Sequence, residues 1–226
     1  MKILIIEDEK EIIKFLKNAL EKEMFIVDSA EDGERGSFMA RTSAYNLIVL
    51  DYLLPKMNGA EVLKEIRDDG LKIPILMLTV KGEIENKKEL FNIGADDYLS
   101  KPFLLEELIL RIKALLKRPL FISQTKLSIG DFSLNQDTKT ICYKNKEIYF
   151  TRKEYCLFEY FLKNKEKIIS RSELLENIWD YNADPFSNSL ETHIASLRKK
   201  LKTNKNRNLL HTFSGRGYKL SLRKLN

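Results

Sequence analysis

The chain has 226 residues, 43% of them hydrophobic and 32% charged, which is enough for two ordinary domains with sizeable cores. It has no apolar stretch of the roughly 18–20 residues that a membrane span needs, and its first apolar run is too short for a signal peptide. Two cysteines, Cys142 and Cys156, form no close metal-type pair, which favours a reducing compartment. We therefore expect a cytoplasmic protein that makes no membrane contact.

The net charge of +6 is divided unevenly along the chain. Residues 1–120 carry 19 basic and 22 acidic side chains, a net of −3, whereas residues 121–226 carry 20 basic and 11 acidic ones, a net of +9. A basic second half favours a polyanionic partner. A solvated, lysine-rich surface explains the charge equally well, so charge alone does not identify a partner.

Short apolar runs alternate with helix-like segments throughout the first half. Runs of this length are typical of buried strands in a parallel sheet, and we expect strands over 3–6, near 25–29, and over 47–50, 75–78 and 98–99. Helices are expected over about 9–22, 32–41, 58–70, 83–93 and 105–117. Five strands with interleaved helices predict an α/β fold with a doubly wound parallel sheet.

Polar residues stand at the end of four of these strands. Glu7 and Asp8 follow the first strand, and Asp51, Thr79 and Lys101 end or follow the later ones. In parallel sheets, ligands bind outside the carboxyl ends of the strands, so these side chains are expected to share a pocket. Three carboxylates favour a hard divalent cation that keeps some of its waters. The chemistry this permits is formation of an aspartyl phosphate, with Mg²⁺ and a lysine neutralising the transferred group.

This arrangement closely resembles the receiver domain of bacterial two-component response regulators, and the matching segments are residues 5–9, 49–55, 58–59, 78–79 and 94–103. The resemblance implies a flavodoxin-like fold in which Asp51 accepts a phosphoryl group. It also implies Mg²⁺ ligation by Asp8, Asp51, the backbone carbonyl of Leu53 and, directly or through water, Glu7. Thr79 and Lys101 would hold phosphoryl oxygens, and Lys101-Pro102 would be a cis peptide.

The pattern changes after residue 119, which predicts a first domain over 1–119, a linker over 120–126 and a second domain over 127–226. A small antiparallel meander is expected from strands over 129–134, 140–143 and 147–150. Thr151 with Glu154 and Ser170 with Glu173 predict capping boxes that open two helices, the second running to Trp179. A third helix from Ser189 should bury one edge made of Leu190, Ile194, Leu197 and Leu201. With a closing hairpin over 209–222, these elements predict an α+β winged helix-turn-helix.

The second half resembles the effector domain of the OmpR/PhoB family in segments 150–155, 170–176, 178–179, 193–201, 212 and 215–218. Outward residues of the third helix would then approach bases or phosphates of double-stranded DNA, namely Asn188, Ser189, Thr192, Ser196, Arg198 and Lys199. The resemblance adds backbone contacts by Trp179, Thr212 and Tyr218, and a basic hairpin tip at Arg216. His193 approaches the backbone by the same resemblance, although a structural role is equally expected. Ser214 stands where the family usually has arginine, so the recognition sequence is not carried over.

The same resemblance implies a switch. A cognate sensor histidine kinase would phosphorylate Asp51, after which Thr79 and Tyr98 would reorient and the receiver would form a homodimer. The salt-bridge candidates at that dimer interface are Lys87 with Glu107, Asp97 with Arg111 and Asp96 with Arg118. The dimer would bind tandem DNA half-sites and regulate transcription, with RNA polymerase as a further partner.

Three alternatives were weighed against this interpretation. A phosphatase with an aspartate nucleophile usually has a second aspartate two residues later, but position 53 is leucine, so no enzyme activity is expected. A nucleotide-binding domain lacks support because Glu7-Asp8-Glu9 replaces a glycine-rich turn. The third alternative is a constitutive dimer that binds DNA without phosphorylation. Val80 beside Thr79 would hinder access to the predicted pocket, which leaves this alternative open.

Overall fold

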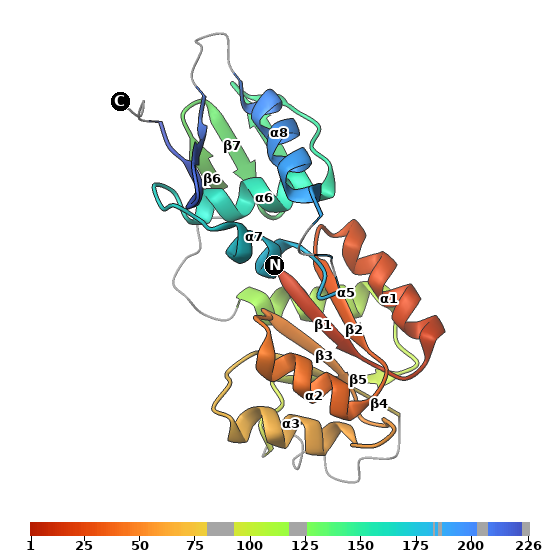
Figure 1. Cartoon of the computed structure of the whole chain (residues 1–226). Coiled ribbons are helices and arrows are strands. Elements are labelled where there is room, and N and C mark those ends of the chain that lie inside the picture. Colours follow the sequence, from red (N-terminus) through yellow and green to blue (C-terminus); the bar gives the residue numbers. More distant parts are fainter. Residues whose placement is uncertain (81–92, 118–125, 183, 185–186, 203–207, 223–226) are drawn as a thin grey trace. The chain divides into compact units, whose positions relative to one another are not determined.

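The structure is a computed structural model that describes residues 1–80, 93–117, 126–182, 184, 187–202 and 208–222. The chain divides into two compact units, Met1–Ile122 and Ser123–Asn226 (Figure 1). All but the last residue of the helix expected over 83–93, including Lys87, lies outside the described residues, and so does Arg118. Among the described residues, every helix is too short or too polar to cross a bilayer.

The first unit is built on a five-stranded parallel sheet with the strand order β2-β1-β3-β4-β5. Its strands are β1 (Lys2–Ile6), β2 (Ile26–Ala30), β3 (Leu47–Asp51), β4 (Ile75–Val80) and β5 (Asp97–Lys101). Its described helices are α1 (Lys10–Lys22), α2 (Gly33–Thr42), α3 (Gly59–Asp68) and α5 (Leu105–Lys117). The doubly wound α/β fold predicted from the sequence is confirmed.

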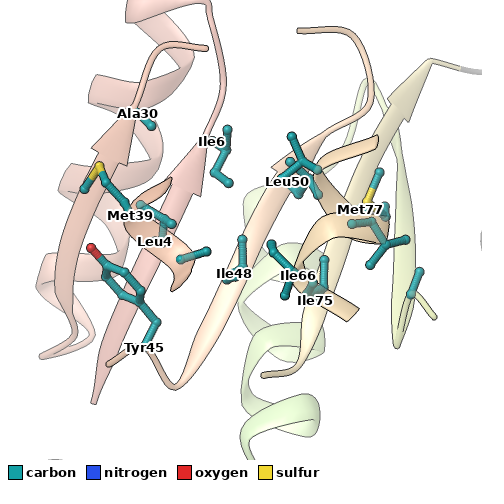
Figure 2. Close-up of a cluster of buried hydrophobic side chains, with 14 residues drawn as sticks. Leu4, Ile6, Ala30, Met39, Tyr45, Ile48, Leu50, Ile66, Ile75 and Met77 are labelled. Carbon is teal, nitrogen blue, oxygen red and sulfur yellow. The ribbon is translucent and has the colours of Figure 1, made fainter. Parts of the chain in front are cut away.

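Strand side chains alternate between two hydrophobic clusters, one on each face of the sheet. Leu4, Ile6, Ile48 and Leu50 point to the cluster that α2 and α3 cover, and Figure 2 shows these residues beside Met39 and Ile66. Ile3, Ile5, Leu47 and Val49 point to the opposite cluster, covered by α1 and α5. Because both faces are buried, β1, β3 and β4 are apolar except near their ends, as is typical of parallel sheets.

The second unit begins with a four-stranded antiparallel sheet rather than the expected three-stranded meander. Its strands, in the order β6-β7-β8-β9, are β6 (Lys126–Ile129), β7 (Phe132–Asn135), β8 (Thr140–Tyr143) and β9 (Lys146–Glu147). The strand expected over 129–134 is wrong because Gly130, at φ +56°, turns the chain between β6 and β7. β6 begins at Lys126, the last residue of the expected linker.

Three helices and a hairpin complete this unit: α6 (Arg152–Lys163), α7 (Arg171–Ile178), α8 (Ser189–Leu201), β10 (Leu210–Phe213) and β11 (Gly217–Leu220). The capping box of Thr151 and Glu154 is confirmed. Ser170 also caps its helix, which is the first half of the capping box predicted there. The carboxylate of Glu173, which would form the second half, instead accepts from the hydroxyl of Tyr160 at 2.9 Å. The predicted buried edge of the third helix is confirmed in full.

The side chain of Asn58 caps the N-terminus of α3. Its side chain accepts from the Glu61 N–H at 3.0 Å, and Glu61 returns a bond to the Asn58 N–H at 2.9 Å. Asn58→Ala should therefore lower the free energy of unfolding of the first unit by about 1 kcal/mol, whereas Asn58→Gly should lower it by only a few tenths. Urea denaturation followed by circular dichroism measures both; equal losses would contradict the capping role.

Candidate functional site

Three carboxylates meet at the carboxyl end of the parallel sheet. Glu7 and Asp8 follow β1, and Asp51 is the last residue of its neighbour β3. Each offers an oxygen atom, and these atoms all lie within 4.8 Å of one another. Glu7 and Asp51 are buried, whereas Asp8 is exposed. The structure thus brings together the three acidic side chains that the sequence predicts as metal ligands.

Lys101 reaches this cluster from β5, on the other side of β4. Its Nζ lies 2.8 Å from Oε2 of Glu7 and 2.9 Å from Oδ2 of Asp51. Burial by itself would lower the pKa of Lys101, but the hydrogen bonds to the two carboxylates outweigh it and raise that pKa. The ammonium is therefore fully charged at neutral pH. The expected cis peptide between Lys101 and Pro102 is present.

The pocket holds more negative charge than one lysine can neutralise. The side chain of Glu7 is fully buried, and burial, together with the charge of Asp51, raises the pKa of Glu7 to about 7 despite the opposing bond from Lys101. Three carboxyl groups thus share one ammonium, and even with Glu7 partly protonated their negative charge exceeds its positive charge. A divalent cation among these oxygens would restore the balance, and an all-oxygen set suits a hard cation.

The loop after Asp51 is held tightly against the end of its strand. The Tyr52 N–H donates to the Leu78 carbonyl at 2.9 Å, and the Gly59 N–H donates to the Tyr52 carbonyl at 2.8 Å. A Cβ atom at Gly59 would collide with the backbone carbonyl of Asp51, so the close return of the chain requires glycine. Leu53 lies within this loop and its side chain is exposed.

The two residues predicted to act in the switch occupy adjacent strands. Thr79 is buried near the end of β4, one position beyond Leu78, which is in register with Asp51. Tyr98 is half-buried on β5 and packs against the cluster of Figure 2. The hydroxyl of Thr79 thus lies at the same edge of the sheet as Asp51, while Tyr98 lies deeper along the neighbouring strand.

Three of the predicted dimer residues already form ion pairs within one chain. Arg111 on α5 contacts both carboxylate oxygens of Asp97, at 3.0 and 2.9 Å, and Oε1 of Glu107, at 3.0 and 2.8 Å. Asp96 instead accepts from Arg67 and from the Ile75 N–H, both at 2.9 Å. The local sequence pattern around Arg67, an arginine near the end of an amphipathic helix, gives no signal for this contact.

The exposed surface of α8 differs from the predicted base-reading set. Asn188, Thr192 and Lys199 are exposed as expected. Ser189 and Ser196 are half-buried: the first hydroxyl pairs with that of Ser187 at 3.0 Å, and the second donates to Glu154 at 2.6 Å.

The remaining predicted DNA contacts lie on or beside the terminal hairpin and α7. Arg198 donates to the Leu210 carbonyl at 3.0 Å and to the Thr212 hydroxyl at 2.8 Å. Arg198 and Thr212, both predicted to contact DNA, therefore bind each other. Arg216 is exposed in the hairpin turn, and Tyr218 is half-buried with its backbone paired to Ile169.

Trp179 and His193 form a largely buried aromatic pair. Trp179 is only 6% exposed, and its ring centroid lies 5.8 Å from that of His193 in an edge-on arrangement. Lys153 covers the indole at 4.8 Å. Burial and the charge of Lys153 lower the pKa of His193. His193 is therefore neutral at physiological pH, and its packing in this structure is that of a structural residue.

Both halves of the chain match known family models. Residues 3–113 match the response regulator receiver domain, and residues 145–220 match the C-terminal domain of transcriptional regulatory proteins. The chain is 34% identical to the transcriptional regulatory protein CusR of Escherichia coli K12, with 98% of each chain covered. It is a response regulator of the OmpR/PhoB family.

Other relatives extend this similarity. The transcriptional regulatory protein CiaR of Streptococcus pneumoniae is 36% identical, over 97% of this regulator and 98% of that chain. The receiver domain of the Francisella response regulator 1452 is 37% identical, with a TM-score of 0.50 over 52% of this chain and 97% of that one. The regulator thus combines a receiver with a DNA-binding effector domain, as expected from the two-component family.

Glu7 should make the receiver less stable as the pH rises from about 4.5 to about 7. The unfolded carboxyl ionises near 4.5, whereas the folded one keeps its proton to about 7. In this window the folded state binds more protons, so the free energy of unfolding falls with pH, by an amount on the order of 2–3 kcal/mol. Urea unfolding across this range, with a chelator present, measures the slope.

Glu7→Gln should remove this slope because the amide does not titrate. Glu11→Gln, at an exposed position on α1, is the matched control and should keep it. If wild type and Glu7→Gln show the same pH dependence, the carboxyl of Glu7 does not hold its proton in the folded pocket.

Proposed function

We propose that a sensor histidine kinase phosphorylates Asp51 in a Mg²⁺-dependent reaction, and that this modification drives receiver dimerisation and binding to tandem DNA half-sites. The observation that carries the proposal is the contact of Lys101 with both Glu7 and Asp51, beside a third carboxylate at Asp8. This set matches what phosphoryl transfer to a carboxylate needs: a nucleophile, a fixed ammonium and oxygen ligands for a cation.

In the proposed step, a carboxylate oxygen of Asp51 attacks the phosphorus of a phosphohistidine on the kinase. A new P–O bond forms as the P–N bond breaks, and the histidine nitrogen takes the electron pair. Lys101 would move from the free carboxylate to the transferred phosphoryl group, and Thr79 would donate to a second oxygen. Glu7, Asp8, Asp51 and the Leu53 carbonyl would hold Mg²⁺, which supplies charge neutralisation.

The proposed switch uses the ion pairs on β5 and α5. Asp97, Arg111 and Glu107 are partly exposed and already form ion pairs within one chain. If two chains exchanged these partners, the number of ion pairs would stay the same. The proposed intermolecular pairs are Lys87 with Glu107, Asp97 with Arg111 and Asp96 with Arg118. Exposed pairs contribute only about 0–1 kcal/mol each, so they would fix the register of the dimer more than its affinity.

Dimerisation would place two basic effector domains on half-sites about one helical turn apart. Binding of the second domain then becomes intramolecular, which raises occupancy without new contacts. Regulation of transcription through RNA polymerase completes the proposal. The principal alternative, a constitutive dimer that binds DNA without phosphorylation, makes the same DNA contacts and differs only in its dependence on Asp51.

Asp51→Asn should abolish the response to beryllofluoride, a phosphoryl analogue that needs the carboxylate and Mg²⁺. Wild type should shift from monomer to dimer and bind DNA at least tenfold more tightly when the analogue is added, as light scattering and fluorescence anisotropy would measure. Asp68→Asn, at an exposed position on α3, is the matched control. A full response in the Asp51 variant would overturn the assignment, and tight binding without the analogue would favour the constitutive dimer.

Lys199→Ala should weaken binding to every DNA sequence by a similar factor, since Lys199 is exposed on α8 and suits a phosphate. The slope of log affinity against log salt should fall by about 1 for each bound effector domain, and so by about 2 for the dimer on its two half-sites. Lys165→Ala removes an equally exposed lysine outside α8 and should leave the slope unchanged. Titrations at several salt concentrations measure both; an unchanged slope in the Lys199 variant would exclude the contact.

A further inference from the structure

We propose that the regulator reads its DNA site through thymine methyl groups, which Thr192 and Ala195 contact in the major groove, and through adenine, which Asn188 binds. This inference rests on the proposed binding of DNA by α8 and specifies the bases recognised. It differs from the set expected from the sequence, because Ser196 and Arg198 leave that set and Ala195 enters it.

Three polar side chains of α8 are bound within the domain, namely Ser196, Arg198 and Lys200. Glu154, buried at the start of α6, accepts from Ser196 at 2.6 Å and from Lys200 at 2.6 Å. Lys200 also donates to the Tyr149 carbonyl at 3.0 Å. Arg198 donates to β10 and to Thr212. These bonds hold Ser196, Arg198 and Lys200 against the rest of the domain, so we assign them to positioning the helix rather than to reading bases.

The side chains left at the surface form one stripe. Asn188, Thr192, Ala195 and Lys199 are all exposed and follow one another at intervals of four, three and four residues. That spacing places them on a single helical face. Opposite this stripe, Leu190, Ile194, Leu197 and Leu201 are buried. The stripe is therefore the surface that α8 can present to a DNA groove.

The middle of the stripe, Thr192 and Ala195, offers methyl groups to a base edge. The Thr192 hydroxyl donates to the Asn188 carbonyl at 3.0 Å, which commits its proton to the helix backbone. Thr192 and Ala195 then each offer a methyl group. On the major-groove edge of DNA, the thymine C5-methyl is the group that such side chains contact. Arginine or glutamine, which read guanine or adenine at long range, does not occur in this stripe.

Asn188 supplies the hydrogen-bonding part of the stripe. It precedes α8 as its N-cap residue, and among the described contacts its side chain makes no capping hydrogen bond. Its amide is exposed and can bind adenine in the bidentate manner typical of asparagine. One adenine contact and two thymine methyl contacts predict a recognition sequence rich in A·T pairs.

Both ends of α8 are held in place, so the stripe is presented by a fixed helix. Arg171 on α7 contacts Glu191 at 3.0 Å and the Ser187 carbonyl at 2.9 Å, which anchors the N-terminal end. Glu154 anchors the C-terminal half through Ser196 and Lys200. Short side chains read bases only when the helix is positioned closely, and these bonds provide that positioning.

The test begins with selection of bound duplexes from random DNA by the full chain, with and without beryllofluoride. Synthetic duplexes of the selected site then carry deoxyuridine in place of one thymine at a time, which removes only the C5-methyl. Two thymines in each half-site should each prove sensitive, with affinity about 3- to 5-fold weaker, the change expected for one buried methyl group. Fluorescence anisotropy at constant salt measures each affinity.

Thr192→Ser removes the protein methyl and keeps the hydroxyl. It should make binding insensitive to deoxyuridine at one of the two thymines while preserving the effect at the other. Lys199→Ala is the control and should weaken binding while preserving both effects.

The outcomes separate the two proposals. An enriched site whose affinity is unchanged by deoxyuridine at every thymine would overturn methyl recognition and leave specific DNA binding intact. Full deoxyuridine sensitivity at both thymines in the Thr192 variant would overturn the assignment to that residue. If no sequence is enriched with or without the analogue, specific DNA binding by this chain, and hence the proposed function, fails.

Discussion

The pocket of the receiver depends on one ammonium group that lies between two buried carboxyl groups. Lys101 on β5 contacts Glu7 after β1 and Asp51 on β3, so a single side chain links the ends of three strands of the sheet. Removing charges from water costs several kcal/mol per ion unless partners compensate. Here the compensation is incomplete, because a third carboxylate at Asp8 lies in the same cluster. The pocket would therefore gain from an added cation, and the proposed phosphorylation of Asp51 would redistribute the contacts of Lys101.

The effector domain also contains buried carboxylates with lysine partners, and one of them, Glu154, contrasts with Glu7. Burial would raise the pKa of Glu154, but Lys200, Ser196 and the Thr151 N–H outweigh it and lower that pKa. For Glu7 the balance is reversed, and the pKa rises to about 7. Glu154 is thus fully satisfied and holds α6 and α8 together, whereas Glu7 lies in a pocket short of positive charge. Native proteins keep such imbalance mainly where function requires it.

Local sequence patterns were sufficient for most of the fold and for the membership of the acidic cluster. Apolar runs marked the five strands, and the cap at Thr151 marked the start of α6, because these signals act over three or four residues. The pattern failed at Gly130, where alternation of apolar residues continued across a turn. It also gave no indication that Ser196 binds Glu154, 42 residues away, or that Arg67 binds Asp96, 29 residues away. Pairings at that separation depend on the packed tertiary structure, which no local period encodes.

The contacts of Asp96 and Asp97 bear on how a receiver dimer could form. Asp96 accepts from Arg67 and from the Ile75 N–H at the start of β4, both through Oδ2, so an intermolecular pair with Arg118 would share a carboxylate that already holds the chain together. Asp97 and Glu107 share Arg111, whose side chain is 37% exposed, and a second chain can approach it without uncovering buried charge. Exchange at Arg111 conserves the number of ion pairs, whereas a pair at Asp96 would be added to bonds that already serve the fold. The pairs around Arg111 are therefore the ones that would set the register of the dimer, with Asp96 holding β4 and β5 in place behind them.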